Sequence, residues 1–434
     1  MRENSIQSQR MQGQELLHAL PLFLALFALT LSVGQPSVSL LPGAAGSSDI
    51  AYYSLPLFAV LYILAFVMLL TRPAASWRVL TNHWSYLAFI TYIILSSLWS
   101  AYPIDVLKKS THYIGILLIC AAAIVALARK EKSMLRIFVA YTSIAIIICI
   151  ATVLISPSRG IDEALSRRWR GLTHHPNVLG SIAMIAVWAN VNYLFYTTRF
   201  KEQIWSVIVI GLAGLCLYGS NSITSTVLSV LLVVVVPMMM WVGKRSIART
   251  ILIVGAIAMS TLLVLAMSTD QSLHSVDVAD EFFAVTGRDK NFTGRTGLWE
   301  MAWSAFKQKP LLGWSFDDLM SFLPIRNLRV SQFHNGYLDL LVRGGIIGWV
   351  FMGYLIIRKY VLLARLARIN WRLFITLASL STTILAFNIT EATLVRGQHL
   401  VWLLFIFVLF SLNHVNLGSS GSDESIEDEH VNAR

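Results

Sequence analysis

Long apolar runs separated by short polar connections dominate the chain from residue 17 to residue 413. Most runs are roughly 17 to 25 residues long, the length that a helix needs to cross the hydrocarbon core of a bilayer. None alternates apolar and polar positions with a period of two, so membrane strands are not indicated. The pattern predicts an all-α integral membrane protein with about twelve spans. The expected spans are 17–33, 51–70, 84–100, 111–128, 134–155, 178–198, 203–219, 223–243, 248–268, 337–357, 373–390 and 399–413.

The composition supports this class of protein. Hydrophobic residues make up 56% of the chain and charged residues only 13%, whereas a soluble domain carries about 25% charged residues. The first apolar run is not followed by a convincing small-residue cleavage site, so we interpret it as an uncleaved anchor. The cysteines lie inside apolar runs without a C-x-x-C partner, which favours packing roles over a disulfide framework or a zinc site. They are Cys120, Cys149 and Cys216.

The basic residues predict the orientation in the membrane. Twelve spans place both termini on one side, and the Lys and Arg of the short loops put that side in the cytoplasm. The basic residues of the inner loops, Arg358 and Lys359 among them, are then expected beside anionic headgroups. The chain divides into spans in 1–268, a large outer segment in 269–335, further spans in 336–414 and a tail in 415–434. The tail is acidic and has few apolar residues, which predicts cytoplasmic disorder.

One outer loop, residues 156–177, is rich in arginine and histidine. Positive charge is disfavoured on this side, so four arginines there suggest an anionic ligand. A guanidinium can donate two parallel hydrogen bonds to phosphate, which makes arginine the usual choice. A solvated loop whose charges lie beside headgroups explains the same pattern, and the loop alone does not decide between these readings. The residues concerned are Arg159, Arg167, Arg168, Arg170, His174 and His175.

The large outer segment ends in two predicted helices. The first runs from Gly297 with a regular apolar face, has Arg295 just before its start, and is ended by Pro310. Between the helices, the adjacent pair Asp317-Asp318 is expected to be solvated, and Arg326 and Arg329 follow in a looser region.

The second helix is expected to begin near Asn335, a good N-cap residue, and to continue into the tenth span. Asp339 and Arg343 lie one turn apart on it, which a local ion pair would explain. His334 would lie at the positive end of the helix dipole, which favours the neutral imidazole that can accept a proton. A lone histidine is more often structural, but several arginines and a membrane span lie close to this one in sequence.

These residues carry a resemblance to a known family. His334-Asn335, nine residues, Gly345, two residues and Gly348 fit the H-[NSQ]-x9-G-x-x-[GTY] pattern of O-antigen ligases and related polysaccharide polymerases. The upstream RTGLWEMAWSAFKQKPLLGWSF is similar to that family's segment, which begins with Arg-Thr and ends in P-L-L-G-x-G. Ser315 stands where the family often has a second glycine. RGLTHHPNVLG and LSSLWSAYP are also similar to family segments, and the chain resembles exopolysaccharide polymerases of the ExoQ kind.

The resemblance implies a metal-independent glycosyltransferase without a cofactor in the bacterial inner membrane. Its donor and acceptor would be oligosaccharides on undecaprenyl diphosphate. The lipid bilayer, a chain-length regulator and export machinery are further expected partners, and nucleic acid is not. By motif position, His334 corresponds to the family's essential histidine and Arg295 to the arginine of its large loop. Either Arg168 or Arg170 corresponds to the arginine of the earlier loop, and Asn335, Gly345 and Gly348 support the site.

The residue types suit this chemistry, but other functions remain open. Arginines can neutralise a departing diphosphate, and histidine is the commonest general base. Polymerase and ligase would share the donor, since they differ in whether the acceptor is a lipid-linked oligosaccharide or lipid A-core. A transporter of polysaccharide or lipid would instead place ionisable residues near mid-membrane. A scaffold protein would need no cluster of arginine and histidine.

Overall fold

The structure is a computed structural model that describes residues 20–30, 49–127, 131–165, 167–242, 295–317 and 332–412. Helices form most of these residues, and the strands within them are β1 and β2, which have two residues each and pair antiparallel. The elements in chain order are Leu20–Thr30, α2 (Asp49–Leu70), α3 (Pro73–Asn82), α4 (Trp84–Leu95), η1 (Ser96–Leu98), α5 (Pro103–Leu127), α6 (Glu131–Ile155), α7 (Pro157–Gly160), β1 (Ile161–Asp162), η2 (Glu163–Leu165), β2 (Arg168–Trp169), α8 (Pro176–Leu194), α9 (Phe200–Ser220), α10 (Ile223–Val242), α13 (Arg295–Gln308), α14 (Gly336–Ile369), α15 (Trp371–Phe387) and Leu400–Leu412.

The helices agree with the predicted apolar runs. Six described helices are long and apolar enough to cross a membrane, or seven if the bent pair of α2 and α3 counts as one span. Four shorter apolar helices cover further predicted spans. Every predicted span except 248–268 therefore coincides with a described helix. That span, most of the 269–335 segment and the tail at 415–434 lie outside the described residues.

Helix α8 and the helix Leu400–Leu412 form the centre of the bundle. Nearly nine-tenths of the apolar window of α8 is buried (89%), against 33% in α9 and in α10. Trp188 of α8 illustrates the packing, because its indole N–H donates to the Thr376 carbonyl of α15. The exposed side chains of α9 and α10 are mostly apolar, as lipid-facing positions require.

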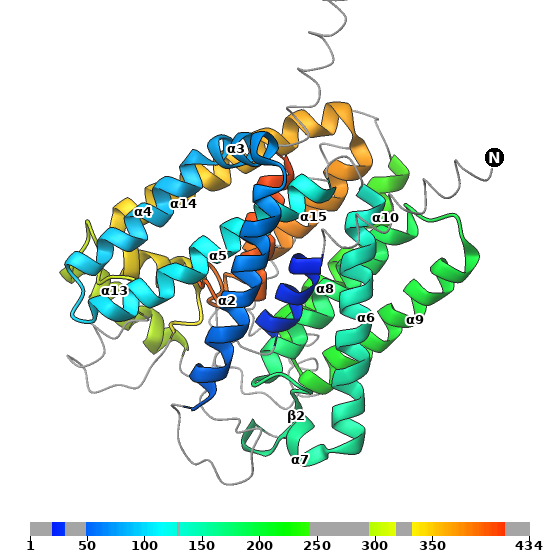
Figure 1. Ribbon diagram of the computed structural model, residues 1–434. Coiled ribbons are helices and arrows are strands. Elements are labelled where there is room, and N and C mark those ends of the chain that lie inside the picture. Colours follow the sequence, from blue (N-terminus) through cyan, green and yellow to red (C-terminus); the bar gives the residue numbers. More distant parts are fainter. Residues whose placement is uncertain are drawn as a thin grey trace, which may run out of the picture.

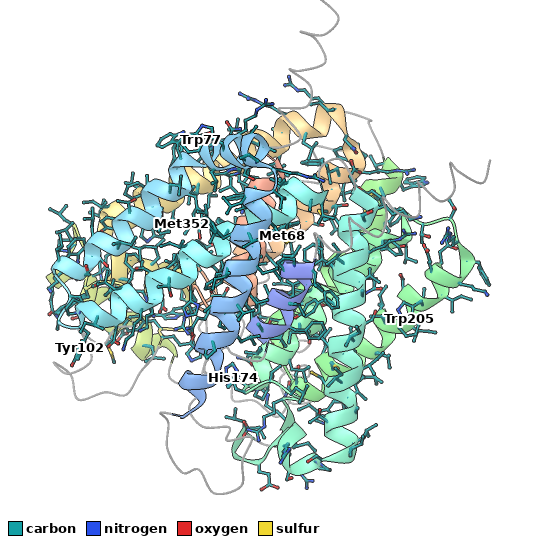
Figure 2. The ribbon with its side chains drawn as sticks, viewed as in Figure 1. Met68, Trp77, Tyr102, His174, Trp205 and Met352 are labelled. Carbon is teal, nitrogen blue, oxygen red and sulfur yellow. The ribbon has the colours of Figure 1, made fainter. Side chains whose placement is uncertain are left out.

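The bundle has two polar ends. At one end the chain bends by 113° between α2 and α3, and Figure 1 shows α3 at the top of the view and α7 and β2 at the bottom. We call the end with α7 and β2 the hairpin end. Figure 2 shows Trp77 of α3 at the first end and His174 toward the hairpin end.

Helix α14 is longer than the predicted span 337–357, because it continues to Ile369. Its continuation buries Lys359 completely, with the ammonium 3.4 Å from the centroid of the Phe405 ring. Arg358 donates to the Ser85 hydroxyl and the Asn82 carbonyl. The expectation that Lys359 lies beside lipid headgroups is therefore wrong, because its amino group lies over an aromatic ring inside the bundle.

Candidate active site

His334 lies immediately before α14, and the start of that helix is built as the sequence predicts. The side chain of Asn335 accepts hydrogen bonds from the backbone N–H groups of Tyr337 and Leu338, which makes it the N-cap. His334 has a φ of 51°, an uncommon backbone conformation for a non-glycine residue. Two residues further on, the backbone N–H of Gly336 donates to the carbonyls of both Asn388 and Glu391. The segment after α15 thus fixes the position of His334.

A chain of polar contacts joins His334 to the arginine-rich loop. Nδ1 of His334 lies 3.8 Å from Oε2 of Glu391. The other carboxylate oxygen of Glu391 accepts a 2.7 Å hydrogen bond from the amide of Asn177. The amide oxygen of Asn177 accepts another 2.7 Å bond, from the guanidinium of Arg168. Glu391 is only 8% exposed, so a buried carboxylate connects the histidine with an arginine from another loop.

Arg168, rather than Arg170, is the arginine of this chain. Arg168 is held in place because its guanidinium also donates to the carbonyls of Ser220 and Asn221. Arg170 is directed elsewhere: it donates to the Arg159 carbonyl and lies 3.8 Å from the carboxylate of Asp162. Strand alternation does not explain this division, because residues two positions apart share a face. Arg168 lies within β2, whereas Arg170 lies beyond the end of that strand.

Asp339 and Arg343 form the local ion pair that their spacing predicted, and the pair belongs to a larger buried cluster. Both side chains are almost fully buried, and the guanidinium of Arg396 lies 3.6 Å from the same carboxylate oxygen that Arg343 contacts at 3.3 Å. The other carboxylate oxygen of Asp339 accepts a 2.7 Å hydrogen bond from the backbone N–H of Phe333. A buried carboxylate between two guanidiniums is well satisfied. It therefore holds the backbone next to His334 and the loop that carries Arg396.

Two further histidines lie beside this chain. His175 caps α8 by accepting a hydrogen bond from the backbone N–H of Asn177. Burial lowers its pKa, and so does the positive charge of Arg168, while Glu391 opposes the shift. Burial, together with His175, Arg396 and Arg170, lowers the pKa of His174 to about 4. Both imidazoles are therefore predominantly neutral at neutral pH.

These shifts predict how stability depends on pH. The unfolded chain binds protons at these histidines near pH 6.5, whereas the folded chain binds one at His174 only near pH 4. Stability from this group is thus complete above pH 6.5 and decreases as the pH falls toward 4. Thermal unfolding of the purified protein at pH 7.5 and 5.0 measures this, and His174→Phe should lose less stability than wild type. Equal losses would contradict the assignment.

The sequence did not identify Glu391 and Arg396 as site residues, and Asn177 had no predicted role although it lies in the RGLTHHPNVLG segment. A signal for the first two was present. The predicted spans 373–390 and 399–413 leave a short outer loop between them, and this loop holds an acid and an arginine. It lies on the same predicted side as the arginine-rich loop and His334. The remaining predicted residue, Arg295, begins α13 two residues earlier than expected, while Arg326 and Arg329 lie outside the described residues.

Comparison with known proteins gives one family match and one similar protein. Residues 207–353 match the family model described as O-Antigen ligase. This region includes His334, Asn335, Gly345 and Gly348. The chain is also 24% identical over 367 residues to the exopolysaccharide production protein ExoQ of Rhizobium meliloti (strain 1021). That similarity covers 79% of this chain and 75% of ExoQ. The two matches support the resemblance to O-antigen ligases and ExoQ-type proteins. The resemblance predicted from the sequence is confirmed, and the apolar helices indicate a multi-pass membrane protein.

The structure gives a physical reason for one glycine of the O-antigen ligase motif. Gly345 interrupts α14 with a φ of 57° and a ψ of −159°. The break frees the carbonyls of Val342 and Arg343, which accept hydrogen bonds from the backbone of Trp314 and Ser315. These backbone hydrogen bonds hold the segment after α13 against the kink in α14. By contrast, a Cβ atom added to Gly348 would meet only ordinary van der Waals contacts, 3.6 Å at the closest.

The departure from the O-antigen ligase pattern at Ser315 also has a physical explanation. Ser315 has a φ of 104°, in a region that glycine adopts most easily. Its buried hydroxyl donates to the Ser96 carbonyl and lies 3.0 Å from the Ser96 hydroxyl. These contacts hold the strained conformation without a glycine.

The prediction that Asp317 is solvated is wrong. Its side chain is fully buried, and it accepts a 2.7 Å hydrogen bond from the hydroxyl of Ser100. The carboxylate therefore fastens the segment after α13 to the connection between η1 and α5, a contact that local sequence does not reveal. Asp318 lies outside the described residues.

Proposed function

We propose that this protein polymerises oligosaccharide repeats linked to undecaprenyl diphosphate into an exopolysaccharide. The proposal rests on the chain of contacts from Arg168 through Asn177 and Glu391 to His334. This chain combines an arginine, which can bind phosphate, with a histidine that lies next to a carboxylate. The similarity to ExoQ, an exopolysaccharide production protein, supports the class of product.

In the proposed reaction, His334 is the general base. Nδ1 faces Glu391, which leaves Nε2 to accept the proton of an acceptor hydroxyl. The hydroxyl oxygen then forms a bond with the anomeric carbon of the donor, while the bond from that carbon to the diphosphate oxygen breaks. Direct displacement inverts the anomeric configuration. The carboxylate of Glu391 stabilises the imidazolium that results and keeps the ring in position.

Arginine side chains would bind the departing diphosphate. Arg168 is the candidate from the first loop, since the polar chain links it to His334. Arg295, at the start of α13, is the candidate from the large loop on its motif position. Two guanidiniums can neutralise charge on a leaving group as a divalent cation does in other enzymes. The transfer is therefore expected to proceed without a metal ion.

The reaction would take place at the periplasmic face of the inner membrane. The charge pattern of the short loops places both termini in the cytoplasm and the loops with Arg168, His334 and Glu391 on the periplasmic side. These three loops meet in the fold, which supports a common side for them. The donor lipid, the growing acceptor, a chain-length regulator and export machinery are the corresponding partners.

Glu391→Gln tests the positioning role of the carboxylate. Glutamine keeps an oxygen for the Asn177 amide but removes the negative charge beside His334. We expect kcat to fall roughly tenfold or more with KM little changed, because the imidazolium loses its partner. Glu163→Gln, at an exposed carboxylate in the arginine-rich loop, is the matched control and should remain active. A variant with reduced thermal stability but normal kcat would show that Glu391 is only structural.

Deletion of the gene tests the proposed product. The deletion strain should still build single repeat units on undecaprenyl diphosphate but secrete no high-molecular-weight exopolysaccharide, with its lipopolysaccharide unchanged. A ligase would share the donor and the base, so motifs in the site do not separate the two activities. Loss of O-antigen from lipid A-core with intact exopolysaccharide would identify a ligase and contradict the proposal.

A further inference from the structure

Helix α13 carries two tryptophans one turn apart, and the first of them contacts the backbone beside the proposed base. The indole N–H of Trp299 donates a 3.0 Å hydrogen bond to the backbone carbonyl of Phe333, the residue immediately before His334. Phe333 is completely buried, so this bond holds α13 against the segment that carries the base. Trp303 lies four residues further along, and side chains at this spacing are neighbours on a helix surface. Trp303 therefore lies next to the tryptophan that contacts this segment.

The side chains of Trp303 and His334 are both accessible from outside the fold. Trp303 is 48% exposed, although tryptophan is strongly buried on average. The side chain of His334 is 29% exposed. The opposite side of α13 is covered, because Ala302 and Ala305 pack into a small apolar cluster with Phe333. An elongated molecule that reaches the imidazole can thus contact the indole without entering the protein interior.

The surroundings of the exposed indole suit a carbohydrate. The centroid of the Phe306 ring lies 5.2 Å from that of Trp303, and the ammonium of Lys307 lies 5.9 Å from the Trp303 centroid. An aromatic ring has a negative face, which attracts the C–H groups on one side of a sugar ring. An ammonium beside the ring can donate hydrogen bonds to sugar hydroxyls. Both kinds of contact are therefore available at one place on α13.

We propose that Trp303 is a stacking surface for the oligosaccharide of the lipid-linked substrate. This inference rests on the proposed function and names the part of the site that binds the sugars. Arg295, the proposed diphosphate-binding residue, begins α13 one turn before Trp299. Along the helix, the order is then the arginine, the tryptophan that contacts the segment of the base, and the exposed tryptophan. A tryptophan at the membrane surface would also be exposed, but contact with the membrane requires no position beside the base.

Two substitutions separate sugar stacking from membrane contact. Trp303→Leu keeps an apolar side chain, which suffices at a membrane surface, whereas Trp303→Phe keeps an aromatic face. We expect Trp303→Leu to raise KM roughly tenfold with kcat within about threefold, and Trp303→Phe to restore most of that loss. Trp77→Leu, at an indole that is 70% exposed on α3, is the matched control and should behave as wild type (Figure 2). Equal effects of leucine and phenylalanine at residue 303 would overturn the inference.

Binding of two lipids to the purified protein in nanodiscs identifies the group that Trp303 contacts. The probes are undecaprenyl diphosphate alone and the same lipid carrying one oligosaccharide repeat. Trp303→Leu should weaken binding of the sugar-bearing lipid roughly tenfold and leave binding of the bare lipid unchanged. Equal weakening of both lipids would assign Trp303 to the lipid or its diphosphate, and no weakening of either would leave it as a residue of the membrane surface; both results overturn the inference.

The outcome for the proposed function is separate. If wild-type protein binds neither lipid, the proposed function itself fails. If wild type binds both and forms polymer while Trp303→Leu does the same, only the role of Trp303 fails. Should Trp303→Leu fold poorly, which a lower thermal midpoint would show, Trp303→Gln provides the second test, because glutamine is a good helix former without an aromatic ring. It should bind the sugar-bearing lipid as weakly as leucine was expected to, and binding as tight as that of wild type would overturn the inference.

Discussion

His334→Ala should reduce polymer formation by roughly 100-fold or more, while the protein still accumulates in the membrane. A positioned general base contributes about 10²- to 10⁴-fold to a rate, and alanine removes it completely. The substitution should cost little stability, because the side chain of His334 is 29% exposed and its fold contacts are made by its neighbours.

The measurement is polymer length on a gel, after expression of the variant in the deletion strain. Membrane level and thermal midpoint are determined in the same preparation. His334→Gln is the conservative companion and should be equally inactive, since an amide does not accept a proton at neutral pH. A His334→Ala strain that secretes wild-type amounts of long polymer would refute the role of His334 as base.

Gly345→Ala should prevent stable folding, whereas Gly348→Ala should not. A Cβ atom on residue 345 would lie 2.3 Å from the Leu311 carbonyl oxygen and 2.7 Å from the Gly313 nitrogen. These are backbone atoms of the segment that is hydrogen-bonded to the kink in α14, so they cannot move aside without breaking those bonds. The left-handed φ adds strain of about 1–3 kcal/mol for any residue with a side chain.

We therefore expect Gly345→Ala to be destabilised by roughly 3 kcal/mol or more, measured as yield of monodisperse protein and thermal midpoint. Two controls on the same helix isolate the effect. Gly348→Ala would make only ordinary contacts, and Gly353→Ala would enter open space. Comparable losses in all three variants would show that α14 tolerates no alanine, and that the kink at Gly345 has no special role.

The sequence alone was sufficient to predict those features of the structure that depend on residues close together in the chain. The apolar runs predicted the helices, and Asn335 predicted the start of α14, because helix length and capping are local properties. It was insufficient where segments far apart in the chain meet. The contact between Asn177 and Glu391 joins residues that are 214 positions apart, and no local pattern favours it.

The errors have the same origin. Lys359 follows an apolar run, as membrane anchors do, but the packing of Leu400–Leu412 places an aromatic ring beside its amino group. Asp317 was expected in water because its neighbour is also acidic, yet the hydroxyl of Ser100 meets it inside the fold. The choice between Arg168 and Arg170 likewise depended on the folded chain, in which the two guanidiniums contact different partners.

The central claim is glycosyl transfer at His334 with arginines in place of a metal ion. Purified protein reconstituted in liposomes with undecaprenyl-diphosphate-linked repeat units tests it most directly, with and without EDTA. The account predicts a ladder of polymer products for wild type, unchanged by EDTA and absent for His334→Ala. A ladder that disappears in EDTA and returns with a divalent cation, or one that His334→Ala also produces, would contradict it.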